Sequence, residues 1–140
     1  MSRDVRVTFF QVKDDLQKRQ KIVQLAQEYF EKKEPLLIRL PHQKAVEYVD
    51  LLLWRLPEAS FLPHVIKDEP CSDTIVLSSS LENPNGARSI LNLCPSEVDN
   101  ENLSFIKIYE LEDLFSTQKH LQAQKHYKSY KNAGFSVITI

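Results

Sequence analysis

The chain has 140 residues, of which 42% are hydrophobic and 26% are charged, and its formal net charge is −1. This composition excludes a disordered or fibrous chain, and the length suits one domain, residues 1–140. The only glycines, Gly86 and Gly134, exclude the glycine-rich loops that bind dinucleotides or nucleoside triphosphates. Because no apolar run is long enough to span a bilayer and residues 1–5 carry no apolar signal segment, we expect a cytoplasmic protein that does not contact a membrane.

Strands and helices are predicted to alternate along the chain. Runs of β-branched, aromatic and aliphatic residues predict strands, and apolar residues at helical spacing predict helices. The predicted strands are 5–12, 36–40, 74–77, 89–93 and 105–109, and the predicted helices are 15–33, 41–56 and 111–132, the last ending at Gly134. Residues 135–140 either add a short edge strand or dock on the core. The alternation predicts an α/β fold of three layers, with a mostly parallel sheet of about five strands and helices on both faces.

Neither the cysteines, the histidines nor the serines show the spacing of a metal or catalytic site. Cys71 and Cys94 are far apart and are expected to be free thiols, and no histidine has a zinc-site context. The serine run 78–80 lacks the turn that exposes a nucleophile. The acidic runs 68–69 and 110–113 are interpreted as solvated charges, the second at the start of the last helix. We therefore predict no metal, no cofactor and no active site.

The second predicted helix has two apolar sides. Its main stripe, centred on Val49, is expected to face the sheet. Leu51 and Trp54 fall on roughly the opposite side of the helix. Either the proline-rich segment 57–70 folds back over these two residues, or they form a partner surface, for which Trp is a favoured anchor.

The last predicted helix is basic. Residues 115–140 contain four lysines and no acidic residue. Lys125, Lys128 and Lys131 form one ridge with Tyr127 and Tyr130 beside it. The lysines favour the negative end of the helix dipole, but the ridge also suits an anionic partner. That partner is either a group that combines a carboxylate with an apolar side chain, or single-stranded nucleic acid.

Four segments together resemble the chi subunit of bacterial DNA polymerase III holoenzyme, over nearly the whole chain. They are Val7-Thr8-Phe9-Phe10, Leu53-Trp54 followed by Ser60-Phe61-Leu62-Pro63-His64, Asn85 leading into Ile90-Leu91-Asn92-Leu93, and Tyr127-Lys128-Ser129-Tyr130-Lys131-Asn132-Ala133-Gly134-Phe135. The second and fourth segments are the most specific. The resemblance implies a Rossmann-like fold without a nucleotide site, and a non-catalytic accessory subunit of the clamp loader.

The resemblance also implies a site on the last helix for the acidic C-terminal tail of single-stranded-DNA-binding protein. The matching positions are Tyr127, Lys128 and Lys131. Where the family commonly has an arginine, one turn before Lys128, this chain has Gln124. Glutamine cannot make the charged, two-pronged contact to a terminal carboxylate that arginine makes.

A second partner surface is implied at Trp54 and Phe61. In the family, the matching aromatic residues contact the psi subunit of the clamp loader, or a helicase that competes for the same surface. The main hypothesis is thus a replisome adaptor that links the clamp loader to single-stranded-DNA-binding protein and reaches DNA only indirectly. The alternatives are a direct single-stranded nucleic-acid binder that uses the last helix, and a small-molecule-binding enzyme with a pocket at the strand ends.

Overall fold

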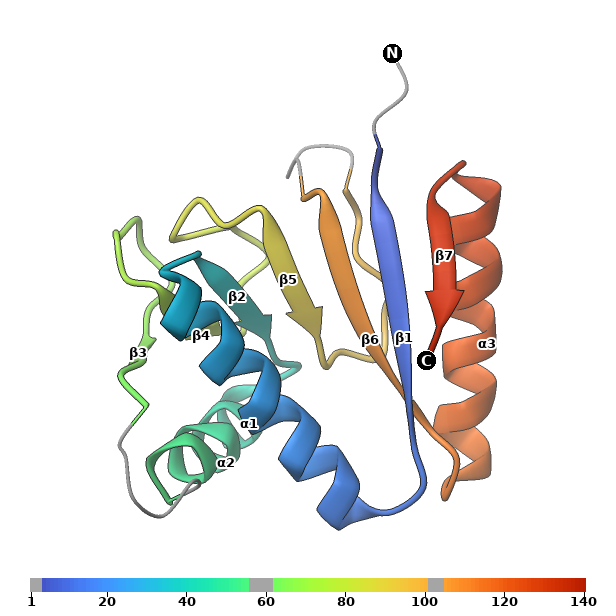
Figure 1. The fold of residues 1–140 in the computed structure, drawn as a ribbon, viewed down its shortest axis with the longest axis horizontal. Helices are drawn as coiled ribbons and strands as arrows, with labels where there is room; N and C mark the ends of the chain where they lie inside the picture. Colours follow the sequence, from blue (N-terminus) through green and yellow to red (C-terminus); the bar gives the residue numbers. More distant parts are fainter. Residues whose placement is uncertain (1–3, 56–61, 101–104) are drawn as a thin grey trace.

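The computed structural model describes residues 4–55, 62–100 and 105–140. These residues form an α/β fold in which seven parallel strands make one sheet and three helices flank it (Figure 1). In chain order the elements are β1 (Arg6–Val12), α1 (Asp15–Lys32), β2 (Leu36–Arg39), α2 (Gln43–Arg55), β3 (Val65–Ile66), β4 (Ile75–Ser78), β5 (Ser89–Asn92), β6 (Lys107–Asp113), α3 (Thr117–Asn132) and β7 (Ser136–Thr139). Across the described residues, no helix combines the length and apolar character needed to cross a membrane.

The strand order across the sheet is β3-β4-β2-β5-β6-β1-β7, and every neighbouring pair is parallel. The sheet thus has two strands more than the sequence predicted. One is β3, a two-residue edge strand inside the proline-rich segment, too short to give a periodic signal. The other is β7, which shows that the chain end adds an edge strand and does not merely dock on the core.

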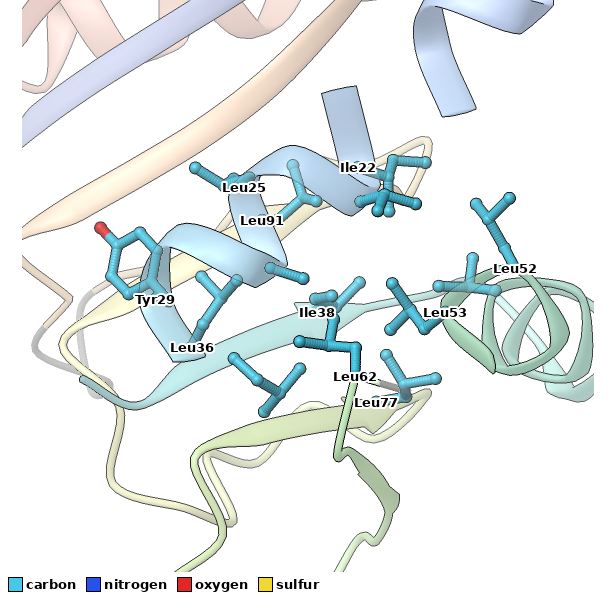
Figure 2. Close-up of a cluster of buried hydrophobic side chains, with 14 of the residues drawn as sticks. Ile22, Leu25, Tyr29, Leu36, Ile38, Leu52, Leu53, Leu62, Leu77 and Leu91 are labelled. Carbon is cyan, nitrogen blue, oxygen red and sulfur yellow. The ribbon is translucent and has the colours of Figure 1, made fainter. Parts of the chain in front are cut away.

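The core on one face lies between α1, α2 and the strands β4, β2 and β5. Figure 2 shows its side chains gathered against β2, which is buried along its whole length. On α2, residues Val46, Val49, Leu52 and Leu53 are buried, as the predicted stripe requires. The α1 helix begins where the Asp14 side chain accepts a hydrogen bond of 2.8 Å from the backbone N–H of Gln17.

The core on the opposite face lies between α3 and the strands β6, β1 and β7. Phe9, Ile108 and Val137 pack there against Ala123 and Tyr130 of α3. The helices therefore cover opposite faces at opposite ends of the sheet, which confirms the predicted three-layer arrangement.

The last helix begins later than the sequence predicted. Strand β6 continues to Asp113, because each of its residues pairs with a residue of β1, from Arg6 opposite Lys107 to Val12 opposite Asp113. The acidic run 110–113 is therefore strand and does not start a helix, which corrects the sequence interpretation. Ser116 caps α3 instead, accepting a hydrogen bond from the backbone N–H of Lys119.

Two leucines of α2 give a test of this packing. Leu53 is fully buried against β2 and β4, whereas Leu51 on the same helix is 50% exposed. We expect Leu53→Ala to lower the free energy of unfolding by about 2–5 kcal/mol, because it leaves a cavity, and Leu51→Ala to lower it by less than about 1 kcal/mol. Urea unfolding of both variants measures this difference. Equal losses would show that α2 packs through another side.

Candidate protein-interaction site

The side chains of α3 divide into an inner and an outer set. Ala123, His126 and Tyr130 are buried against the sheet. Lys125, Lys128 and Lys131 are exposed, as are Gln124 and Leu121. Tyr130 therefore does not stand beside the lysines as an accessible ring, which corrects the sequence interpretation. Half-buried Tyr127 is the tyrosine that borders the basic ridge.

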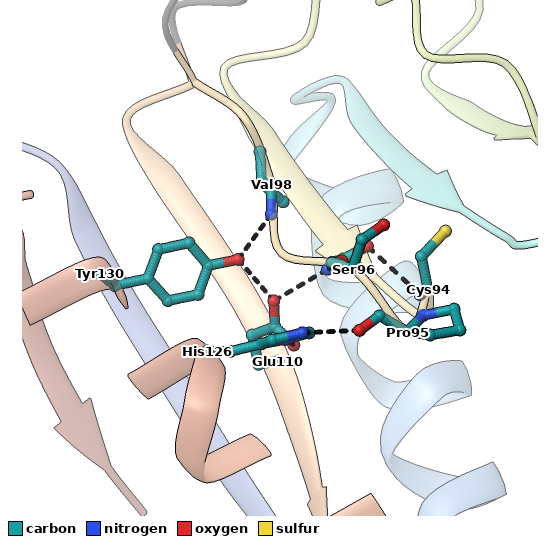
Figure 3. A network of polar contacts seen from close by, with 8 residues as sticks. Cys94, Pro95, Ser96, Val98, Glu110, His126 and Tyr130 are labelled. Carbon is teal, nitrogen blue, oxygen red and sulfur yellow. Dashed lines mark hydrogen bonds and ion pairs between the residues drawn. The ribbon is translucent and has the colours of Figure 1, made fainter. Parts of the chain in front are cut away.

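A buried carboxylate fixes α3 on the sheet. Glu110 of β6 accepts hydrogen bonds of 2.6 Å from the Tyr130 hydroxyl and 2.9 Å from the Asn92 side-chain amide, both on Oε2. Its Oε1 lies 3.1 Å from Nδ1 of His126. The other ring nitrogen of His126, Nε2, lies 2.8 Å from the carbonyl oxygen of Pro95. Figure 3 shows His126 and Tyr130 of α3 beside Glu110, with Pro95 next to His126 and Val98 next to Tyr130.

This geometry favours the protonated form of His126. Both of its ring nitrogens face acceptors, and only the doubly protonated ring can donate from both. Burial alone would lower the pKa of His126, but the hydrogen bond and the negative charge of Glu110 outweigh it and raise the pKa above its ordinary value. Burial and the same carboxylate also raise the pKa of Tyr130, which therefore stays a neutral donor.

A second charged contact joins α3 to α1. Asp113, at the end of β6, is 1% exposed, and its Oδ2 lies 2.8 Å from Nζ of Lys18 and 3.7 Å from Nζ of Lys119. Lys18 comes from α1 and Lys119 from the first turn of α3, so one carboxylate holds the two helices at the same edge of the sheet. Lys18 and Asp113 are far apart in the sequence, so no local sequence pattern predicts their contact.

A small cavity of about 190 Å³ lies at this carboxyl edge of the sheet. Lys18, Asn92, Cys94, Glu110, Asp113, Lys119 and His126 are among its lining residues. α/β proteins commonly bind ligands in a crevice at this edge of the sheet. The sequence analysis did not predict the residues that line this one. Its charged groups are paired with one another, however, and burial raises the pKa of the Cys94 thiol, which opposes a reactive thiolate. In the described residues no three His, Cys, Asp or Glu side chains are grouped to hold a metal ion.

A larger pocket of about 550 Å³ lies between α3 and the ends of β1 and β7. We call it the α3 pocket, and it is lined by Phe9, Gln11, Glu112, Ala123, Gln124, Tyr127, Lys128 and Thr139. The rings of Phe9 and Tyr127 lie 5.6 Å apart in a tilted contact. The structure thus brings together three of the four residues predicted for the tail site. The fourth, Lys131, does not line the pocket, but its Nζ lies 5.9 Å from the centre of the Tyr127 ring.

The one acidic residue that lines the α3 pocket has partners within this part of the structure. Oε1 of Glu112 accepts a hydrogen bond of 3.1 Å from Gln11, and its Oε2 lies 3.0 Å from Nδ1 of His120. Gln124 is held at the rim by a 3.3 Å contact between its Nε2 and Nε2 of His120. These contacts hold the Glu112 side chain, which is 12% exposed, so the pocket carries both this carboxylate and the exposed ammonium group of Lys128.

The outer side of α2 presents a row of large side chains. Tyr48, Leu51 and Trp54 are 51%, 50% and 41% exposed. The Trp54 ring also lies 4.5 Å from the ring of His64, in a tilted contact. His64 is held in turn by Asp50, 2.8 Å away. Phe61, the other residue predicted for this surface, lies outside the described residues.

Comparison with known proteins places these features in a family. The sheet and helices define an α/β protein with an all-parallel sheet. Residues 5–138 match the family "DNA polymerase III chi subunit, HolC", so the chain belongs to the chi subunit family of DNA polymerase III. Members of this family are non-catalytic accessory subunits of the polymerase holoenzyme.

Other comparisons add little. No curated protein matched the chain by sequence. Among solved structures, a chain from the S. cerevisiae complex of a Dbp5 C-terminal domain variant bound to a Gle1 variant and IP6 is similar at 7% identity. The match covers 99% of this chain and 76% of that chain with a TM-score of 0.34, which is too low to carry an argument.

The ion pair between His126 and Glu110 predicts how stability depends on pH. A histidine whose pKa is raised on folding stabilises the folded state below its ordinary pKa of 6.5 and loses this contribution as the pH rises through the raised value. We expect the free energy of unfolding to fall as the pH rises from 6.5 through the raised pKa of His126. The variant His126→Gln should not show this fall. Urea unfolding at a series of pH values measures it.

The matched control is His42→Gln, which replaces an exposed histidine just before α2, whose Nδ1 accepts a hydrogen bond of 3.2 Å from the backbone N–H of Ala45. A glutamine oxygen can accept the same bond, so the fall in stability above pH 6.5 should remain as in wild type. If the free energy of unfolding changes with pH in the same way for wild type and His126→Gln, then His126 is not charged in the folded protein.

Proposed function

We propose that residues 1–140 act as one adaptor domain of the replisome, which binds the acidic C-terminal tail of single-stranded-DNA-binding protein in the α3 pocket and the clamp loader through α2. The observation that carries the first part is the α3 pocket itself. It places two aromatic rings, a free lysine and an amide around one hollow of about 550 Å³.

The chemistry of the α3 pocket complements the end of such a tail. A chain end that carries an aromatic or other apolar side chain fits against Phe9 and Tyr127. Its terminal carboxylate then lies within reach of the ammonium group of Lys128 and the amide of Gln124. Acidic residues before the chain end are attracted by Lys125 and Lys131, which are exposed farther along the helix.

The charges set a limit on the affinity. An exposed ion pair contributes little, about 1 kcal/mol or less, so binding depends on several charges acting around one apolar anchor. Gln124 supplies no charge at the position where the family commonly has arginine. Micromolar affinity, about −8 kcal/mol, is therefore the expected ceiling.

Charge reversal at Lys128 tests the tail site. We expect Lys128→Glu to weaken binding of a tail peptide at least tenfold, about 1.4 kcal/mol, because it places a negative charge against the peptide carboxylates. Gln124→Arg should strengthen binding, because a forked cation can hold the terminal carboxylate. Fluorescence anisotropy with a labelled tail peptide measures both changes.

The control is Lys44→Glu, which makes the same charge change on α2, away from the α3 pocket. It should leave peptide affinity within about twofold of wild type. Equal binding of a peptide that lacks its terminal residue, or of the Lys128→Glu protein, would show that α3 is not the tail site.

The second partner surface is the outer side of α2. Its support is the exposed row of Tyr48, Leu51 and Trp54, because large exposed side chains in a contiguous row are typical of protein interfaces. The partner proposed for it is a psi-like subunit of the clamp loader, or a helicase that competes for the same residues. Phe61 is proposed to belong to this surface on the strength of the family resemblance alone.

Truncation of Trp54 tests the α2 surface. We expect Trp54→Ala, and likewise Phe61→Ala, to weaken binding of the clamp-loader partner by about 2 kcal/mol or more, since central aromatic residues dominate such interfaces. Calorimetric titration of the purified partner measures this. Lys128→Glu is the control, and it should bind the partner like wild type. Unchanged partner affinity in both aromatic variants would place the interface elsewhere.

A further inference from the structure

Part of one sheet face, at β6, β1 and β7, carries exposed side chains. The α3 helix covers β6, β1 and β7 from one side, while α1 and α2 lie on the other side, over β4, β2 and β5. Figure 1 shows α1 toward the β2 end of the sheet and α3 beside β7, with β1 and β6 uncovered between them in this view. The α1 helix contacts this side at Phe10 and Tyr109, through Lys21 and Tyr29. We call the rest of it, which carries Arg6, Lys107 and Ile138, the open sheet face. Ile138, at its edge, is 52% exposed.

Two cations lie side by side at one end of the open sheet face. Arg6 of β1 is the direct register partner of Lys107 of β6 and of Ser136 of β7. Like charges at directly opposed positions destabilise a sheet. Among the described residues, no carboxylate lies within ion-pair distance of either side chain, so the fold itself does not explain why both are cations.

A hollow of about 460 Å³ lies next to these cations. Arg6, Thr8, Lys107, Tyr109, Ser136 and Ile138 line it. The Tyr109 ring stacks nearly parallel on Phe10, with an angle of 9° between the planes and centroids 5.8 Å apart. A contact with α1 holds Tyr109 in place, because its hydroxyl oxygen lies 2.6 Å from the hydroxyl oxygen of Tyr29. A rigid aromatic surface thus adjoins a pair of unneutralised cations.

We propose that the open sheet face binds single-stranded nucleic acid. Phosphates would lie against Arg6 and Lys107, and a base would lie over the hollow beside Tyr109, with the hydroxyls of Thr8 and Ser136 available to its edge. A flat sheet with aromatic rings and basic side chains suits unpaired bases, because every base offers a planar face for stacking.

This site is separate from the tail site. It lies on the other side of the sheet from α3, and its residues share none with the α3 pocket. The adjoining hollow shares Thr8 and Tyr109 with this site, and its one acidic side chain, Glu28 of α1, lines it together with Lys21. Contact with nucleic acid here would let the protein touch the strand while its tail site holds the protein that coats the strand.

The test is anisotropy with a labelled oligothymidylate of about 15 nucleotides at low salt. We expect weak binding, with a Kd on the order of 10⁻⁵ M, that falls as salt rises. The double variant Arg6→Gln with Lys107→Gln should bind at least about tenfold more weakly and should lower the slope of log K against log salt by about 1.4, since two phosphate contacts are lost. Both residues are at the surface, and relief of their repulsion should leave the protein at least as stable, which unfolding in urea checks.

Two further variants of the protein serve as controls. The double variant Lys13→Gln with Lys44→Gln removes the same charge at exposed positions elsewhere, and it should bind the oligonucleotide like wild type. Lys128→Glu should also keep oligonucleotide binding, whether or not it loses the tail peptide, so this proposal and the tail proposal can fail independently.

Three outcomes would overturn the proposal. The first is equal loss of binding in both double variants, which would mean a general effect of charge. The second is loss of oligonucleotide binding in Lys128→Glu with none in the Arg6 and Lys107 variant, which would place nucleic acid on α3. The third is an oligoglutamate peptide that binds the open sheet face more tightly than the oligonucleotide does.

Discussion

Glu110 is a carboxylate buried in the middle of a parallel sheet, and the position of the last helix depends on the groups that satisfy it. A buried charge that loses a partner destabilises a protein by about 3–5 kcal/mol. Asn92 supplies one donor from the neighbouring strand, and His126 and Tyr130 supply two from α3. Because these two residues are one helical turn apart and must face inward, the rotation of α3 about its axis is fixed. Tyr127 and Lys128 are thereby placed at the pocket.

The arrangement of helices separates the surfaces that we propose for partners. The α1 and α2 helices cover one face at one end of the sheet, and α3 covers the opposite face at the other end. The α3 pocket, the outer side of α2 and the open sheet face are consequently well separated. Under the proposed function, the protein can hold the single-stranded-DNA-binding protein and the clamp loader at the same time, since neither partner needs the surface of the other.

Much of the fold could be predicted from the sequence, because the signals are local. The buried stripe of α2, the placement of Leu51 and Trp54 on its other side, and the lysine ridge of α3 all follow from helical periodicity. The family resemblance, carried by residues such as Trp54 and Tyr127, was confirmed by the match over residues 5–138.

The errors arose where long-range contacts override a local pattern. The run 110–113 is acidic and precedes a helix, so it was interpreted as a helix start. In the structure, pairing with β1 keeps it extended, and Lys18, His126 and Tyr130 neutralise or satisfy its buried carboxylates. Tyr130 was placed beside the lysines for the same reason, because its partner Glu110 lies 20 positions earlier in the chain. No window of local sequence contains both residues.

The central claim is that the α3 pocket receives the acidic tail of single-stranded-DNA-binding protein. Titration of the isotope-labelled protein with the tail peptide, followed by amide chemical shifts, tests it most directly. The account predicts saturable shifts at Phe9, Gln124, Tyr127, Lys128 and Thr139, with little change at Arg6, Lys107 and Leu51. Shifts concentrated on α2 or on the open sheet face, with α3 unmoved, would contradict it.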